Sequence, residues 1–210
     1  MKKINAKTEI VSQIKNRELV KQKQIQIAMG ASKLFIKKGY GRTNIREISK
    51  ASGLTIGNLY DYITKKEDVL YLVFEVFHKL WVNRLEEEGV YKIEDPVMQL
   101  RVALQKMFEL VDVYRDMVLL MYTETKLLPK EYIKTILMKE GELVQCFDKI
   151  LVHGVNKGVF KSKDTFFLAN IIVYLLSIEA LRGWSLRRRY DASKISALIT
   201  EFIVDIVTKL

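Results

Sequence analysis

The chain has 210 residues, of which 49% are hydrophobic and 29% charged, the composition of a globular protein that can bury a core. Its single cysteine excludes an internal disulfide, and its two histidines lie too far apart for a zinc site of clustered ligands. The longest nearly apolar run, residues 166–178, is too short to cross a bilayer, so we expect a cytoplasmic protein with no membrane partner.

The net charge of +10 is concentrated at the start of the chain. Residues 1–70 contain 15 lysines and arginines against 6 acidic residues, a net charge of +9, whereas residues 71–210 contain 20 against 19, a net charge of +1. Such asymmetry is typical of a polyanion-binding end attached to a nearly neutral body. The alternative, that the basic residues only add solubility, leaves the neutral body unexplained.

Helical periodicity becomes regular at about residue 20. The preceding residues, 1–19, are polar and basic and form either a mobile arm or an early extension of the first helix. Ile27, Ala31 and Phe35 fall on one face of that helix, and Gly39, directly after two lysines, predicts its end.

Two short helices and a third, longer one are expected next. Thr43 can cap a helix over about 45–51, and Gly53 ends it in a tight turn. A second short helix is expected over about 55–63, after which Thr64 to Glu67 fit a capping box that opens a longer helix.

The rest of the chain also has a helical pattern. Asp95 followed by Pro96 predicts a capped helix start, and Gly154 and Gly158 predict a helix end. The expected helices of the body run over about 96–114, from 129 to the glycines at 154 and 158, over 164–186 as one long apolar helix capped by Asp164, and over 191–208.

Residues 43–63 therefore predict a helix-turn-helix, preceded by a third helix. In this arrangement the second helix lies in the major groove of DNA, with its N-terminal residues at the base edges. Those residues are Thr55, Ile56, Gly57 and Asn58. The amide of Asn58 can read an adenine, Ile56 can meet a thymine methyl, and Gly57 lets the helix come close to DNA.

Aromatic and basic side chains beside these residues are candidate phosphate contacts. Tyr60 and Tyr62 lie two apart on a helix and point about 200° apart, so at most one of them packs inward. Lys66 adds charge at the N-terminus of the next helix, and Arg46 completes the candidate set. Asp61, between the two tyrosines, is expected to point away from DNA. The alternatives are that the tyrosines are packing residues and Lys66 an ordinary solvated lysine.

The stretch of residues 25–70 resembles the N-terminal domain of the TetR (tetracycline-repressor-like) family of bacterial transcription regulators. The residues that match its pattern in register are Ala31, Leu34, Phe35, Gly39, Thr43, Ile45, Ile48, Gly53, Gly57, Leu59, Tyr60, Tyr62, Lys66 and Glu67. Departures such as Ile63 for the usual phenylalanine remain apolar.

The resemblance implies an all-α protein with a helix-turn-helix DNA-binding domain over residues 20–70 and a ligand-binding and dimerisation domain over 71–210. It also implies a repressor that binds a near-palindromic operator as a homodimer through its last two helices and that a small molecule releases. On the family pattern, Thr43 contacts phosphate, and Tyr62 and Lys66 clamp the DNA backbone.

A lipophilic ligand is expected among the large apolar side chains of the body, although most of these are equally good core residues. The candidates are Phe108, Met117, Met121, Tyr122, Phe147, Tyr174 and Trp184. Residues 122–144 are similar to the body of TetR-type regulators of fatty-acid metabolism, which implies an acyl-CoA-like ligand.

Other classes of protein find less support in the sequence. It has no nucleophile–base pair, paired carboxylates or phosphate-binding loop, so we expect no catalytic residues, no cofactor and no enzyme activity. The remaining alternative is a constitutive DNA-binding protein without a ligand.

Overall fold

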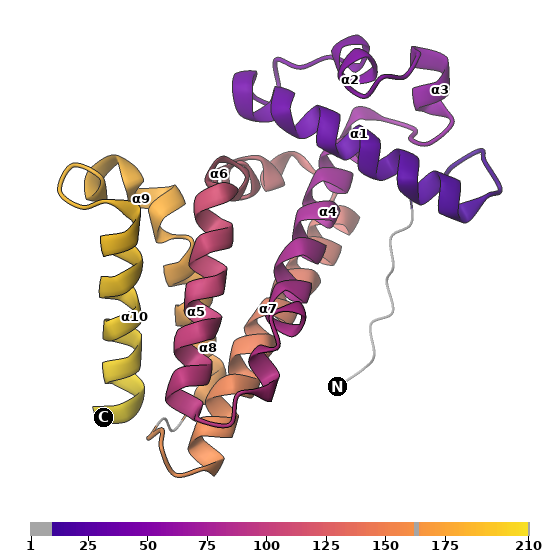
Figure 1. Cartoon of the computed structure of the whole chain (residues 1–210). Helices are drawn as coiled ribbons and strands as arrows, with labels where there is room; N and C mark the ends of the chain where they lie inside the picture. The colour runs from indigo at the N-terminus through magenta and orange to yellow at the C-terminus, as the bar shows by residue number, and fades with distance from the viewer. Residues whose placement is uncertain (1–9, 162–163, 210) are drawn as a thin grey trace. The chain divides into compact units, whose positions relative to one another are not determined.

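The computed structural model describes residues 10–161 and 164–209 (Figure 1). Regular structure in these residues is helical throughout, with ten α-helices and two short 3-10 helices, so the expected all-α class is confirmed. The first nine residues of the expected basic arm lie outside the described part. The described chain divides into two compact units, one formed by residues up to 78 with 120–139, the other by residues 79–119 with 140–210.

The first unit holds the helix-turn-helix. Its elements are α1 (Arg17–Lys38), α2 (Ile45–Ala51), α3 (Ile56–Tyr60), the beginning of α4 (Lys66–Glu87), the end of α6 (Arg115–Glu124), η2 (Thr125–Leu127) and the beginning of α7 (Lys130–Asn156). Side chains from the first four helices are buried, among them Ile27, Phe35, Ile48, Leu59 and Leu70. Residues 120–139, which the sequence placed in the second domain, thus belong to the same unit as the helix-turn-helix.

Helix α1 begins earlier than expected and ends where expected. Asn16 caps it, because its side chain accepts a hydrogen bond from the backbone N–H of Leu19. The last three residues of the predicted arm are therefore helical. At the other end, the N–H of Gly39 donates to the carbonyl of Phe35, so Gly39 is the predicted stop.

The second unit is a bundle of longer helices. It contains the remainder of α4, η1 (Val90–Lys92), α5 (Pro96–Val113), the beginning of α6, the remainder of α7, α8 (Thr165–Leu176), α9 (Ile178–Leu186) and α10 (Ala192–Lys209). Asp95 caps α5 by accepting from the N–H of Met98, with Pro96 at the first helical position, as expected. Helix α5 packs against both α8 and α10 (Figure 1).

The two glycines that were expected to end α7 have different functions. Only Gly158 lies beyond the helix, with a positive φ of 70°, whereas α7 continues through Gly154 to Asn156. A Cβ atom on residue 154 would come within 1.9 Å of the Phe160 ring, which is buried. Glycine is therefore required at 154 by side-chain packing, and the expectation that Gly154 stops the helix is wrong.

The long apolar helix expected over 164–186 is also wrong, although Asp164 caps its start as predicted. The helix breaks at Ser177 into α8 and α9, which are bent by 50° relative to each other. Among the described residues no single helix is long and apolar enough to span a membrane, and only this bent pair reaches that length and composition when taken together.

Candidate DNA-binding surface

Helix α2 is started by Asn44 rather than by Thr43. The Asn44 side chain accepts from the N–H of Glu47, and the Glu47 carboxylate accepts from the N–H of Asn44, which completes a capping box. The Glu47 carboxylate also pairs with Lys38 of α1. This hydrogen-bonded ion pair lowers the pKa of Glu47 and connects α1 to α2. The prediction that Thr43 caps this helix is wrong by one residue.

Thr43 itself is turned into the protein. Its side chain is 2% exposed, its hydroxyl donates to the carbonyl of Gly39, and its N–H donates to the carbonyl of Tyr40. Both of its donors are therefore occupied, and the expected contact between Thr43 and phosphate has no basis in this geometry. Arg46, the second residue of α2, is exposed.

The turn between α2 and α3 is built as the sequence indicated. Gly53 has a φ of 65°, a conformation that favours glycine, and its N–H donates to the carbonyl of Lys50. The amide of Gln26 in α1 donates to the carbonyl of Ser52 over 2.6 Å. This side chain holds α1 against the turn and so sets the direction in which α3 leaves it.

Helix α3 is short, and one face of it is exposed. Thr55 caps it, since the threonine hydroxyl accepts from the N–H of Asn58 over 3.1 Å. Leu59 anchors the helix because it is completely buried. The residues predicted to read DNA are all exposed: Thr55, Ile56, Gly57, Asn58 and Tyr60. A single apolar anchor thus leaves the whole predicted recognition set on the surface.

The two tyrosines of this region point in different directions. Tyr60 is 41% exposed, whereas Tyr62 is 8% exposed and its carbonyl accepts from the amide of Gln24 in α1. At most one of them was expected to pack inward, and that one is Tyr62. Tyr62 was expected to clamp the DNA backbone together with Lys66, but its buried ring has little surface to contribute, whereas Tyr60 is exposed.

The described part of the arm contacts the end of α3. The Asp61 carbonyl accepts from the Ser12 hydroxyl over 2.7 Å and from the Gln13 N–H over 3.0 Å. Asp61 therefore holds the arm through its own backbone carbonyl. As a result, residues 12–13 lie beside the predicted recognition helix.

Helix α4 is capped by Asp68 and not by Glu67, so the predicted capping box is wrong in its acidic member. One Asp68 oxygen, Oδ2, accepts from the N–H and the hydroxyl of Thr64, both over 2.7 Å, and from the N–H of Lys65 over 3.0 Å. Asp68, the third residue of α4, therefore closes the first turn of the helix.

Lys66 is partly buried instead of free in solvent. Its ammonium group donates to the carbonyl of Tyr40 over 2.6 Å and lies 4.1 Å from the centroid of the Tyr40 ring. Burial lowers the pKa of Lys66, while burial and the nearby Glu67 raise the pKa of Tyr40 to about 12. Lys66 thus joins α4 to the loop before α2, and the neighbouring Lys65 is the more exposed of the two lysines.

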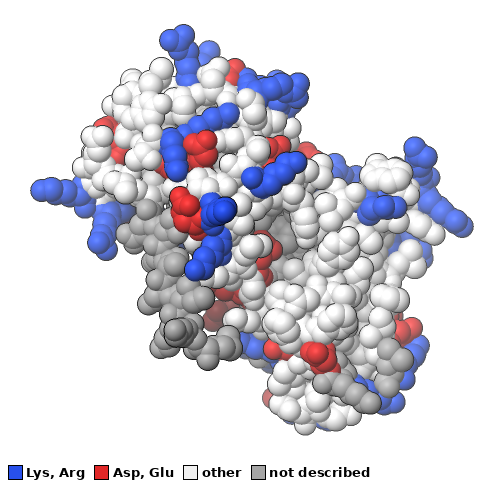
Figure 2. Space-filling view, turned by 180° about the vertical axis from the view of Figure 1, so that it is seen from behind, with Lys and Arg blue, Asp and Glu red and all other residues white. Residues whose placement is uncertain are grey.

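Exposed cations surround the helix-turn-helix. Figure 2 shows lysine and arginine side chains that project from several places on the surface of the first unit. Those within the helix-turn-helix and the loops beside it are Arg42, Arg46, Lys50 and Lys65. Exposed cations next to an exposed recognition helix suit a DNA backbone, whose charge supplies much of the binding energy.

The seven candidate ligand residues lie in both units, five in the second and two in the first. Phe108, Met117 and Phe147 are buried in the second unit, where Tyr174 and Trp184 are exposed. In the first unit Met121 is half-buried and Tyr122 exposed. None of the seven lines the open pocket of about 430 Å³ that the described residues form on α7.

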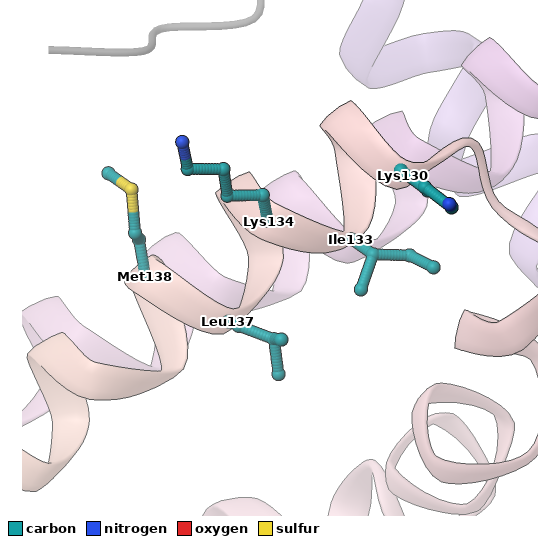
Figure 3. Close-up of a pocket in the computed structure, with 5 residues that line it drawn as sticks. All are labelled: Lys130, Ile133, Lys134, Leu137 and Met138. Atoms are coloured by element: carbon teal, nitrogen blue, oxygen red, sulfur yellow. The ribbon is translucent and has the colours of Figure 1, made fainter. Parts of the chain in front are cut away.

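That pocket is formed by the first turns of α7, in the first unit (Figure 3). Its lining residues are Lys130, Ile133, Lys134, Leu137 and Met138. Three apolar side chains thus lie beside two ammonium groups, a combination that suits an amphipathic anion. Sequence reasoning missed it because the apolar residues of an exposed helical face look like core residues. Among the residues that the structure describes, no group of metal-ligating side chains comes together.

These features define a helix-turn-helix DNA-binding protein. The model of the bacterial regulatory proteins of the tetR family matches residues 27–71, and the model of the tetracyclin repressor-like C-terminal domain matches residues 94–179. Together they cover more than half of the chain. The chain belongs to the TetR family of DNA-binding transcription regulators.

Relatives of known name agree with this assignment. The HTH-type transcriptional regulator HbdR of Aromatoleum sp. (strain CIB) is 27% identical over 190 residues, 88% of this chain and 80% of HbdR. FadR from Bacillus subtilis, solved with stearoyl-CoA, has a TM-score of 0.75 at 21% identity, over 87% of this chain and 98% of FadR. AibR, solved with isovaleryl coenzyme A and operator DNA, has a TM-score of 0.70 at 20% identity, over 86% and 97%. Both structures establish a shared fold.

Proposed function

We propose that the protein is a cytoplasmic repressor that binds a near-palindromic operator as a homodimer and leaves it when an acyl-CoA-like ligand binds. The observation that carries the DNA-binding role is the exposed face of α3, held by the buried Leu59. On this proposal Asn58 reads an adenine edge and Ile56 meets a thymine methyl. Tyr60 and Arg46 contact phosphates, which position the helix in the groove.

Replacing Tyr60 with alanine is expected to weaken operator binding by roughly tenfold or more, the order expected for one lost contact. Tyr60 is exposed, so its loss should leave the fold intact. The measurement is fluorescence anisotropy with a duplex that the wild-type protein selects from a random-sequence library. Tyr60→Phe, which keeps the ring and removes the hydroxyl, separates stacking from hydrogen bonding. Unchanged affinity of Tyr60→Ala, with the thermal unfolding of the wild type, would contradict this role.

Exposed apolar side chains of the second unit support the homodimer. They lie on α8, at Phe166, Phe167, Ile171 and Tyr174, and on α10, at Leu198 and Phe202. Figure 2 shows a broad area of the second unit without charged side chains. The last two helices were the expected interface, but the break at Ser177 puts these side chains on α8 and α10, with the short α9 between them in the chain. A helix that is apolar on its outer face needs a cover, and a second copy supplies it.

The pocket on α7 supports an amphipathic anion as the effector. Ile133, Leu137 and Met138 suit an acyl chain, while Lys130 and Lys134 suit phosphate groups. Two solved structures with the same fold hold coenzyme A thioesters. The alternative remains a constitutive DNA-binding protein that no ligand releases.

Long-chain acyl-CoA is expected to release the duplex, and coenzyme A alone is not. Anisotropy titrations of the DNA complex with coenzyme A and with thioesters of increasing chain length measure this. Replacing Lys130 and Lys134 together with alanine should raise the half-releasing concentration roughly tenfold or more, because charge-assisted contacts are lost. Lys126→Ala, which removes an exposed lysine outside the pocket, is the matched control. If no thioester changes DNA affinity, the constitutive alternative holds.

A further inference from the structure

Asp68 joins three parts of the first unit. The residue is 1% exposed, and its two carboxylate oxygens have different partners. Oδ2 accepts the three hydrogen bonds from Thr64 and Lys65 that close the first turn of α4. Oδ1 accepts from the Tyr132 hydroxyl of α7 over 2.6 Å. One buried carboxylate thus connects the loop after α3, the start of α4 and the start of α7.

Tyr132 is held in the orientation that this bond needs. Its ring stacks on Tyr71 of α4, with centroids 4.4 Å apart and planes at 20°. The ammonium group of Lys65 lies 5.4 Å from the Tyr132 ring centroid. Burial, together with the hydrogen bond to Asp68, raises the pKa of Tyr132, so the hydroxyl keeps the proton that it donates. Ring packing and protonation state therefore both favour the contact with Asp68.

The segment that Asp68 holds leads directly from the recognition helix. Helix α3 ends at Tyr60, and only residues 61–65 separate it from α4. Within this linker, two backbone N–H groups, those of Thr64 and Lys65, and the Thr64 hydroxyl donate hydrogen bonds to Asp68. If Oδ1 lost its donor, a buried carboxylate oxygen would remain without a partner, an unfavourable state that the residue can relieve only by moving. Such a movement would loosen the linker.

We infer that Tyr132 is a positioning residue for DNA binding: through Asp68 it holds the linker, and with it α3, in the orientation that DNA requires. The inference rests on the proposed function. It makes the start of α7 part of the DNA-binding machinery, although it lies far along the chain from the helix-turn-helix.

The opposite face of the same α7 turns carries the pocket. Successive residues of an α-helix are rotated by about 100°, so Tyr132 and Lys139 project from one side of α7. Lys139 on that side pairs with Glu75 of α4 over 2.7 Å. By the same rotation the residues that line the pocket, shown in Figure 3, project from the other side. A ligand that displaces these turns therefore acts directly on the hydrogen bond to Asp68.

A matched pair of substitutions tests the inference. Tyr132→Phe keeps the ring stack and removes the bond to Asp68, whereas Glu75→Gln weakens the ion pair between the same two helices two turns away. Affinity is measured by anisotropy with the duplex selected by the wild type, and exchange of the Thr64 and Lys65 amide hydrogens is measured on the protein without DNA. Tyr132→Phe is expected to weaken binding roughly tenfold, about 1.4 kcal/mol, and to speed this exchange, while Glu75→Gln leaves both within twofold.

Unchanged affinity of Tyr132→Phe would overturn the inference, whether or not exchange at Thr64 and Lys65 is faster. Equal losses of affinity in the two variants would overturn it as well. A change only in thermal unfolding, shared by both variants, would assign Tyr132 a purely structural role and would also overturn it. A wild-type protein that selects no duplex would instead refute the proposed function, and the exchange comparison, which needs no DNA, distinguishes the two failures.

Discussion

Replacing Phe202 with glutamate is expected to convert the proposed homodimer into a monomer and to lower operator affinity by roughly a hundredfold or more. Phe202 is 55% exposed on α10, so the change removes no core contact from the single chain. In the proposed dimer the carboxylate would be buried against apolar side chains of the second copy, and an unpaired buried charge is strongly unfavourable. A monomer also loses the gain in affinity, on the order of 10²- to 10⁴-fold, that two linked half-site contacts provide.

Light scattering during gel filtration measures the molar mass, and anisotropy measures the DNA affinity of the same sample. Val113→Glu is the control, because Val113 is the more exposed of the two at 74% and lies at the end of α5 rather than on α8 or α10. The control should remain dimeric and bind DNA as the wild type does. A Phe202→Glu protein that stayed dimeric would show that the two copies meet through another surface.

Gly57→Ala is expected to change stability and DNA affinity in opposite directions. A Cβ atom at this position would have only the Thr55 hydroxyl near it, at 4.0 Å, so nothing in the chain itself requires glycine. Alanine in a helix is more stable than glycine by up to about 1 kcal/mol, and the free protein should therefore unfold at a slightly higher temperature. Against DNA, the added methyl group meets a surface that α3 approaches closely, and overpacking costs about 1–3 kcal/mol, which is roughly a tenfold to hundredfold loss of affinity.

Gly141→Ala provides the control for this prediction. Gly141 lies inside α7, and a Cβ atom there would also meet no other atom within 4 Å. The same gain in helix stability is expected at 141, with DNA affinity unchanged. If Gly57→Ala bound the selected duplex as tightly as the wild type, residue 57 would not lie against DNA and the orientation proposed for α3 would be wrong.

Local sequence patterns located the starts of α2 and α4 to within a few residues but did not select the correct capping side chains. Thr43 and Asn44 are both good caps, as are Glu67 and Asp68 as acidic partners of Thr64. The choice depends on which residue has extended backbone angles and on where its side chain points once the helix has packed. Asn44 has φ −113° and ψ 165° and caps α2, whereas the Thr43 hydroxyl is used by the carbonyl of Gly39.

Features that depend on side-chain packing were the hardest to interpret from the sequence. Gly154 has the pattern of a helix stop, but α7 continues through it, and the Phe160 ring against it leaves no space for a side chain. The apolar run through Ser177 reads as one helix because nothing in its composition marks the bend. Size and apolarity likewise do not tell a core side chain from a pocket side chain: Phe108, Met117 and Phe147 are buried, and the pocket on α7 is lined by other residues.

The sequence by itself determined the helix-turn-helix and its candidate recognition residues, because these depend on short-range signals: one helical face and the turn at Gly53. Only the tertiary structure decided that Tyr62 packs inward while Tyr60 stays exposed, and that Lys66 contacts Tyr40. It also brought Tyr132 to Asp68, across 64 positions of the chain. No periodicity or motif links residues so far apart, because their contact exists only after separate helices have packed together.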